Sequence, residues 1–436
     1  MFPLRLPILL LVALSAAVAS AAPASEPEPE RPGFTLEQAV VLGARNSAAI
    51  IQAQGAVRSA AAARRSAWGA YLPRPSLTGT GSVSSSTRFN PQTNLPSTGS
   101  SNSVQAGAAV TWDLFTGGRR GAEQDRARAQ STVASSTLVQ QERSVTYLVT
   151  QAFYEALRGE QLTAVARSRI QRAKVGYAAA EKRALVGSST RSDVLRAALE
   201  VNSASSAELE ALNTRDAAEL QLGQYVGLTG PARAVPAPGE YDVTPLVVPD
   251  SFVEEVVEAL PELRAARASV DAARASVRSA QAAYWPTLRL SAGYDWFTQN
   301  VDLANGRTSW SGRLGVSLPL FDGFVREETI VNARVTETTV QGQLAELLRT
   351  ARSELGQAVN RLRLANNRLE LTTEAASVAR EDLRVQQERY NQGLTTMLEF
   401  LTSQENLVTA ETDQVGARFD REIARAEVEA LSGRSL

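Results

Sequence analysis

The stretch from Phe324 to Gln392 contains no proline and constrains the fold more than any other part of the chain. Its apolar side chains recur in alternating steps of four and three, which is the heptad pattern of helices packed along a seam. The seam positions are Leu344, Leu348, Ala351, Leu355, Ala358, Leu362, Ala365 and Leu369. At ~1.5 Å per residue such a helix is ~100 Å long. The sequence therefore predicts a rod, and a function exerted over a distance of that order.

The two halves of the chain repeat the same motifs at a constant spacing. Leu114-Phe115-x-Gly117 recurs as Leu320-Phe321-x-Gly323, and Gly187 recurs as Gly393, each 206 residues further on. Tyr71-x-Pro73 recurs as Tyr284-x-Pro286 at a spacing of 213 residues. Shared spacings of this kind predict a tandem duplication. We place the length difference in a loop between paired strands, where insertions are tolerated.

The duplication divides the chain into segments. We expect a signal peptide over 1–21, a disordered Pro/Glu-rich segment over 22–33, a first repeat over 34–230, a Pro-rich linker over 231–250, a second repeat over 251–433 and a tail over 434–436. The first repeat is expected to hold strands at about 76–86 and 104–114, with a Ser/Asn/Pro-rich loop between them, and a long helix at about 119–186. The second is expected to hold strands at about 287–297 and 309–320 and a long helix at about 324–392. Because the flanking helices are about half as long, each repeat is interpreted as a two-layer helical rod carrying a β-hairpin.

The N-terminus has the features of a secretory signal. Arg5 supplies a positive charge, Leu9 to Val18 form an apolar core, and Ala19-Ser20-Ala21 fits a cleavage site. A membrane-anchoring helix is the alternative, but the apolar run is too short for one. Because the chain has no cysteine, we expect no lipid anchor at the N-terminus.

Composition narrows the possible functions. The chain has no histidine and no cysteine, so the commonest catalytic bases and zinc ligands are missing. With 45 Lys and Arg against 46 Asp and Glu, the net charge is −1, which does not favour a nucleic-acid-binding protein. We expect no enzyme activity and no cofactor.

The expected strands alternate apolar and polar residues. In the second repeat one face carries Leu288, Leu290, Tyr294, Trp296, Trp310, Leu314, Val316 and Leu318. Strands of about ten residues with one apolar face and aromatic side chains near the ends are typical of a transmembrane β-barrel. A soluble sheet packed on the helices is the alternative. Four strands cannot close a barrel in lipid, so a membrane sheet requires several copies of the chain: two would give eight strands and three would give twelve.

The order of helix, strand pair, long helix, glycine turn and helix, present twice, resembles the TolC family of outer-membrane ducts. The resemblance is also carried by Phe34-Thr-Leu-Glu-Gln-Ala-Val40, Tyr71-Leu-Pro73, Pro261-Glu-Leu-Arg-Ala-Ala266 and Tyr390-x-x-Gly393, and it covers residues 34–433. It implies a mainly α fold with a small transmembrane β part: tandem helical hairpins forming an α-helical barrel, and four strands per chain in a trimeric 12-stranded β-barrel. It also implies a location in the outer membrane and the periplasm, with outer-membrane lipid, a periplasmic adaptor and an inner-membrane transporter as partners.

The resemblance further implies two functional regions. The turns Gly187-Ser188-Ser189-Thr190 and Gly393-Leu394-Thr395-Thr396 would form the tips that dock on the adaptor. The periplasmic aperture would involve Glu399, Thr402, Asp193 and Tyr390, with Tyr390 and Asp193 linking the two hairpins. An acid often found in the family is replaced by Thr402, and an arginine of its best-known member by Thr395. Asp193 and Glu399 also fit capping boxes, a purely structural role.

Three functions remain open from the sequence. The first is a passive exit duct of a tripartite efflux pump or a type I secretion system. The second is a periplasmic coiled-coil scaffold whose strands form a soluble cap. The third is an envelope hydrolase, for which no nucleophile–base pair is visible.

Overall fold

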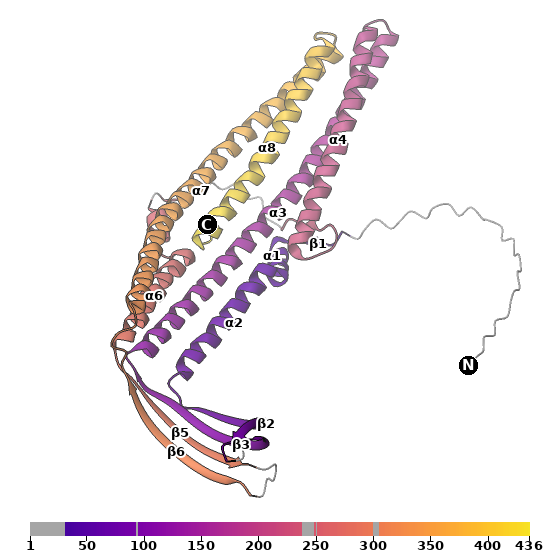
Figure 1. The fold of residues 1–436 in the computed structure, drawn as a ribbon. Coiled ribbons are helices and arrows are strands. Elements are labelled where there is room, and N and C mark those ends of the chain that lie inside the picture. Colours follow the sequence, from indigo (N-terminus) through magenta and orange to yellow (C-terminus); the bar gives the residue numbers. More distant parts are fainter. Residues whose placement is uncertain (1–30, 93–94, 238–247, 250, 300–304) are drawn as a thin grey trace, which may run out of the picture.

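The structure is a computed structural model that describes residues 31–92, 95–237, 248–249, 251–299 and 305–436. The expected signal peptide and most of the Pro/Glu-rich segment lie outside the described residues. Long helices run side by side away from a curved sheet at one end (Figure 1). Among the described residues, none of the helices combines the length and the apolar character that crossing a membrane requires.

The helices fall into two sets of similar design. The first set is α1 (Leu36–Asn46), α2 (Ala48–Gly69), α3 (Arg119–Leu185) and α4 (Arg191–Val226). The second set is α5 (Phe252–Val257), α6 (Pro261–Gln281), α7 (Val325–Asn391) and α8 (Met397–Ser432), with a 3₁₀ turn at Ala282–Tyr284. The helices α3 and α7 have 67 residues each, and α4 and α8 have 36 each. The mainly α fold of duplicated helical hairpins is therefore confirmed.

Each long helix lies beside two shorter ones. Towards the sheet the packing order across the layer is α2, α3, α6, α7, and towards the far tips it is α4, α3, α8, α7. The helix α7 therefore lies at one lateral edge of the protomer, and α2 and α4 lie at the other. Figure 1 shows the two hairpins, α3–α4 and α7–α8, extending to separate tips.

The heptad seam of α7 is buried inside the protomer. Ala358 and Leu362 have no exposed surface, and Leu355 is almost fully buried. They pack in one cluster with Phe252, Val256 and Val257 of α5 and Val428 of α8. Leu344 and Leu348 lie at the partly buried edge of that cluster. Small residues at alternate seam positions let neighbouring helices approach closely.

Replacing Ala358 by tryptophan should lower the thermal stability of the protein. The site has no free surface, so the ring would overpack the seam at a cost of ~1–3 kcal/mol or more. Thermal unfolding followed by circular dichroism measures the effect, and the exposed Gly342→Ala on the same helix is the control. An unchanged melting temperature would contradict the packing described here.

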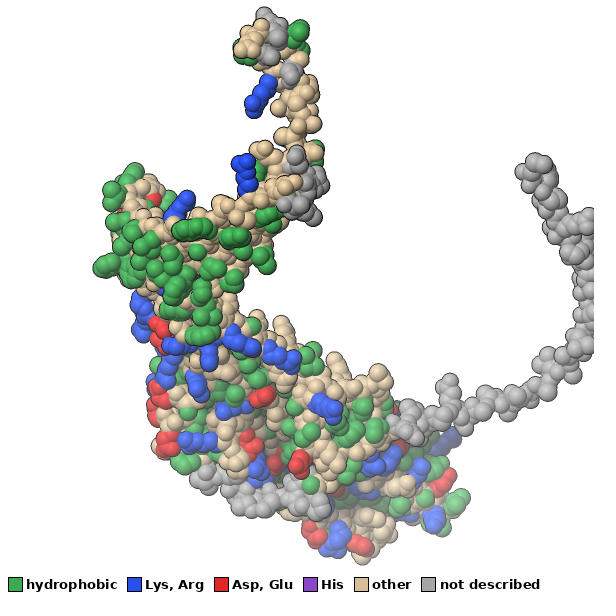
Figure 2. Space-filling view, turned by 90° about the horizontal axis from the view of Figure 1, so that it is seen from below, with side chains coloured by type: hydrophobic (Ala, Val, Ile, Leu, Met, Phe, Trp, Pro, Cys, Tyr) green, Lys and Arg blue, Asp and Glu red, His purple; other side chains and the backbone are tan. Residues whose placement is uncertain are grey.

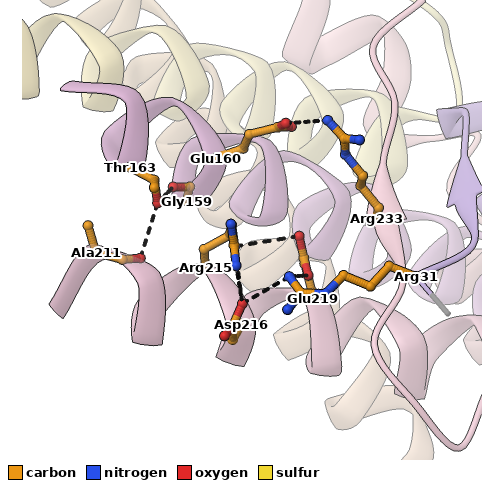
Figure 3. Close-up of polar contacts among 9 residues, drawn as sticks. All are labelled: Arg31, Gly159, Glu160, Thr163, Ala211, Arg215, Asp216, Glu219 and Arg233. Atoms are coloured by element: carbon orange, nitrogen blue, oxygen red, sulfur yellow. Dashed lines mark hydrogen bonds and ion pairs between the residues drawn. The ribbon is translucent and has the colours of Figure 1, made fainter. Parts of the chain in front are cut away.

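The end of the Pro/Glu-rich segment is ordered, contrary to expectation. Gly33–Phe34 (β1) pairs in parallel with Arg233–Ala234 (β4), which the sequence assigned to a linker. Arg31 forms ion pairs with Asp216, at 3.2 Å, and with Glu219, at 3.0 Å (Figure 3). Composition suggested disorder because the partners that hold this segment are nearly 200 residues away in the sequence.

The strands form one antiparallel sheet in the order β2-β3-β5-β6. Their bounds are β2 Arg74–Asn90, β3 Leu95–Thr116, β5 Thr287–Thr298 and β6 Arg307–Ser317. In the second hairpin, β6 ends at Ser317 rather than near 320, so Leu318 lies outside the strand. Pro319 follows, and it has no N–H with which to continue the ladder.

The first hairpin is much longer than expected. The segment between the two expected strands is largely β-ribbon rather than a loop. Within this segment Thr87 pairs with Thr98 across the ribbon at 2.9 Å, and Ser103 and Ser101 pair with Ser82 and Ser84 of the preceding strand at 2.7 and 2.9 Å. These hydroxyl contacts stabilise strands whose composition resembles a loop.

Candidate functional site: an open sheet and two helical tips

One face of the sheet is apolar and exposed. Cross-strand neighbours on this face are Tyr294 with Trp310, Leu290 with Leu314, and Leu288 with Val316. The exposed fractions of Trp310, Leu314 and Val316 are 82%, 62% and 70%. Figure 2 shows apolar side chains gathered over the sheet next to its junction with the helices. A contiguous apolar surface of this kind marks contact with a membrane or with another protein.

The other face of the sheet is polar and concave. A Cβ on Gly107 would lie 2.5 Å from Asp295 Oδ1 and 3.3 Å from Thr78 Oγ1, so side chains crowd together there. On the apolar face, a Cβ on Gly79 or Gly312 would meet nothing within 4 Å. We call the polar side the concave face. Crowding on one side and open space on the other are what a curved sheet produces.

Both edges of the sheet are unpaired within the described part of the protomer. The strand β2 pairs only with β3, and β6 pairs only with β5. Their outward-facing N–H and C=O groups have no partner strand. Such edges are templates for pairing with another chain.

Two arginine–tyrosine stacks lie where the helices meet the sheet. The guanidinium of Arg120 lies 4.7 Å from the ring centroid of Tyr71, and that of Arg326 lies 4.7 Å from that of Tyr284. Arg120 also donates to the carbonyl of Leu114, and Arg326 to that of Leu320. We did not predict these stacks, although the spacings of the duplication relate both arginines and both tyrosines.

The tips of the two helical hairpins have the same backbone design. Gly187 N–H donates to Ala184 C=O (3.1 Å) and Ser188 N–H to Arg183 C=O (2.9 Å), and the equivalent bonds occur at Gly393 and Leu394. This is the Schellman pattern, which needs a left-handed residue after the helix. The φ angles of Gly187 and Gly393 are +74° and +78°. At the tips Leu185 is 88% exposed and Leu394 is 64% exposed.

The two acids after the tips form the expected capping boxes. Thr190 N–H donates to Asp193 (3.1 Å), and Asp193 N–H donates to Thr190 Oγ1 (3.2 Å). Thr396 N–H donates to Glu399 (3.1 Å), and Glu399 N–H donates to Thr396 Oγ1 (3.2 Å). Thr395 supplies a further hydroxyl donor to Glu399.

Hydrogen bonds to these acids favour their charged form. The Thr190 hydroxyl lowers the pKa of Asp193, and the Thr395 hydroxyl lowers the pKa of Glu399. A lowered pKa in the folded state means that each acid stabilises the fold above its unfolded pKa. That contribution is lost as the pH falls through the folded value. At neutral pH both tips therefore carry carboxylates.

The structure does not join Tyr390 to Asp193, contrary to the link that the resemblance implies. Asp193 Oδ2 accepts the hydrogen bonds of its own cap, and Asp193 Oδ1 lies 3.5 Å from Arg196 Nη1. The Tyr390 ring lies under Arg183, with 4.6 Å between the guanidinium carbon and the ring centroid, and stacks on Phe400 at 5.3 Å. The Tyr390 hydroxyl is buried and has no hydrogen-bond partner among the described residues.

Arg183 is the tip residue that sequence reasoning missed. It lies at the end of α3 and donates to the carbonyls of Tyr390 and Ser188, so it joins one hairpin to the other. The only local signal was a basic residue in the last turn of a helix. Thr402, which replaces an acid of the family pattern, donates its hydroxyl to Leu398 C=O (3.0 Å).

Comparison with known proteins identifies the family that shares this architecture. A family model described as outer membrane efflux protein matches residues 41–228 and 253–434, which together span most of both repeats. The chain belongs to the outer membrane efflux protein family. This outer membrane efflux protein is 30% identical to protein CyaE of Bordetella pertussis over 403 residues, which cover 90% of this chain and 82% of CyaE.

Solved structures share the fold of this outer membrane efflux protein. It aligns with CusC at 18% identity and a TM-score of 0.81, covering 92% of each chain. It aligns with the outer membrane protein VceC of Vibrio cholerae at 19% identity and a TM-score of 0.77, covering 92% of this chain and 96% of that one.

Family membership decides between the functions left open by the sequence. The protein is an outer-membrane exit duct of an efflux pump or a type I secretion system, which works with an adaptor and an inner-membrane transporter. It is neither a soluble scaffold nor a hydrolase. The expected location in the outer membrane and the resemblance to TolC are confirmed.

Proposed function

We propose that three copies of the chain form the duct, with their four-stranded sheets closing a 12-stranded barrel in the outer membrane. The observation that carries this proposal is the exposed apolar face of a curved sheet whose two edges are unpaired. In lipid, unpaired backbone groups are costly, so the edges must meet other strands. Pairing β6 of one copy with β2 of the next satisfies both edges and turns the apolar side chains towards outer-membrane lipid. The lipid-facing set then comprises Leu288, Leu290, Tyr294, Trp296, Trp310, Leu314 and Val316, with Leu318 just beyond the strand.

A second apolar stripe on α7 supports the same closure. Leu364, Leu371, Val378 and Val385 are exposed and occur at every seventh position. Each lies two residues after a buried residue of α7, namely Leu362, Leu369, Ala376 and Leu383, which is ~200° around the helix. The stripe therefore points away from the protomer at its lateral edge.

The opposite lateral edge offers a matching surface. The helix α4 exposes Leu195, Leu199 and Leu209. Packing α7 of one copy against α4 of the next would bury both sets, and repeating that contact around an axis gives a closed ring of helices.

The tips are placed for docking. They lie at the opposite end of the molecule from the sheet (Figure 1), so a sheet in the outer membrane directs both tips into the periplasm. The docking surface proposed for the adaptor consists of Gly187, Ser188, Ser189, Thr190, Gly393, Leu394, Thr395 and Thr396. Glu399, Asp193, Thr402 and Tyr390 lie within or next to the same tips and are proposed to surround the aperture.

Conductance of the purified protein in a planar bilayer tests the proposed duct. A heat-resistant oligomer that is extracted only by detergent and produces stepwise conductance is expected. A monomer that leaves the membrane without detergent and carries no current would contradict the proposed trimeric barrel.

The charge of Glu399 should make the resting duct prefer cations. Three-fold symmetry would hold three carboxylates around one narrow mouth, where they attract cations, and salt weakens the effect. Glu399→Gln keeps a side chain that can cap the helix but removes the charge, so the cation preference should fall while the protein stays folded. Reversal potentials under a KCl gradient measure this change. Equal values for variant and parent would leave Glu399 with the capping role alone.

A further inference from the structure

All charged residues of β2, β3, β5 and β6, the four strands of the antiparallel sheet, lie on the concave face. They are Arg74, Arg88, Asp113, Arg289, Asp295, Arg307 and Arg313. The cross-strand register places them together: Arg289 lies opposite Asp113, Asp295 opposite Gly107, and Ser291 opposite Arg313. The apolar face has none, so the separation of charge between the two faces is complete within these strands.

The concave face carries an excess of positive charge. Five arginines face two aspartates, which is a net charge of +3 per chain. The Arg289–Asp113 pair, at 2.7 Å, neutralises one arginine. In the part of the chain that the structure describes, Arg74, Arg88, Arg307 and Arg313 form no ion pair with a carboxylate, and all four are exposed. The positive charge is therefore available to solutes.

All four of these arginines lie on the edge strands, Arg74 and Arg88 on β2 and Arg307 and Arg313 on β6. Arg74 of β2 and Arg313 of β6 belong to one cross-strand row, through Thr111 and Ser291. Closing a barrel brings the β6 edge of one copy against the β2 edge of the next. Arginines from both edges would then recur around the same lumen.

We propose that the membrane section of the duct favours anions, and that Arg74 and Arg313 are the main determinants of this selectivity. The inference rests on the proposed function, because only closure with the apolar face outward turns the concave face into a lumen. A narrow aqueous pore with walls of one charge concentrates the opposite ion. The class of substrate that this section favours is anionic solutes, or polypeptide segments rich in Asp and Glu.

The two ends of the duct then have opposite preferences. The tips carry carboxylates and the membrane section carries guanidinium groups. In a series of conducting sections the narrowest contributes most to the measured selectivity, so the negative charge at the tips is reduced before the selectivity of the membrane section is measured. Glu399→Gln removes one of the two tip carboxylates, and Asp193 is the same in every variant that is compared.

The test uses the full-length oligomer in planar bilayers under a KCl gradient, in the Glu399→Gln background. Adding Arg74→Gln and Arg313→Gln together should lower the chloride-to-potassium permeability ratio by roughly twofold or more. Adding Asp295→Asn instead removes a negative charge from the same face and should shift the reversal potential in the opposite direction. Heat-resistant migration of each oligomer verifies that the variants assemble.

Opposite shifts for the arginine pair and for Asp295→Asn support an anion-favouring lumen. If the channel conducts and its reversal potential does not change when both arginines are replaced, the inference is wrong, while the proposed trimeric barrel still stands. If the parent forms no channel, the proposed duct itself fails, and the inference fails with it.

Discussion

Leu290→Arg and Val316→Arg variants are expected to give little or no oligomer in outer-membrane fractions. Both residues are exposed on the apolar face, in rows that pair Leu290 with Leu314 and Val316 with Leu288. An arginine facing lipid costs ~2–4 kcal/mol near the bilayer midplane, and less towards the interfaces. In a trimer the cost is incurred three times in one cooperative assembly, so a change that a soluble surface would tolerate should prevent insertion.

The neighbouring Ser291 supplies the matched control. Ser291→Arg adds the same charge one residue along the same strand, but on the concave face next to Arg313. It should assemble normally, because the lumen of a membrane barrel is polar. Oligomer yield is measured on unheated gels of detergent-extracted outer membranes. Normal yield from both lipid-face variants would mean that the apolar face does not contact lipid.

The helical part of the fold could be predicted because its signals repeat locally. A heptad at Leu355, Leu362 and Leu369 needs no distant partner to be recognised, and glycines at 187 and 393 end helices by their own backbone preference. The constant spacing of the repeated motifs then predicted that the two long helices, α3 and α7, have equal lengths. The capping boxes could be predicted for the same reason. Thr396 and Glu399 are three residues apart, and the side chain of each accepts a hydrogen bond from the backbone N–H of the other.

The errors lie where partners are far apart in sequence. The ribbon from Thr87 to Ser103 resembles a loop in composition, and hydroxyl contacts such as that of Thr87 with Thr98 form only after the hairpin has formed. Arg31 and its acidic partners on α4 are more than 180 residues apart. Arg183 and Tyr390 are joined across 207 residues, and the residues next to Arg183 in the sequence do not indicate this contact.

The same distinction explains why Tyr390 contacts a different residue from the one that the resemblance implies. The resemblance supplied Asp193 as its partner, but in this chain Asp193 is used by Thr190 and Ser189 of its own cap. The guanidinium of Arg183 stacks on the Tyr390 ring instead. A motif can therefore fix where a residue lies without fixing which residue it contacts.

Gly393→Val is expected to abolish export while leaving oligomer assembly and barrel insertion intact. The obstacle is backbone strain rather than lack of space: a Cβ would lie 3.5 Å from Arg183 Nη2, an ordinary contact, but φ is +78°. A β-branched residue resists this conformation, so the turn must change and the exposed Leu394 must move. Gly187→Val should act similarly at the other tip, where a Cβ would meet nothing within 4 Å.

The Gly393→Asn variant distinguishes backbone strain from a general effect of replacing this glycine, because asparagine tolerates the left-handed region better than valine does. Gly393→Asn should therefore retain much more export than Gly393→Val, with equal amounts of oligomer in the outer membrane. Since the chain has no cysteine, a single Leu394→Cys can be cross-linked cleanly to the cognate adaptor, and the valine change should weaken that cross-link. Adaptor cross-links that map to cysteines placed between Thr87 and Asn102, and not to the tip, would reverse the orientation assigned here. The sheet end would then face the periplasm, and the tips could not be the docking surface.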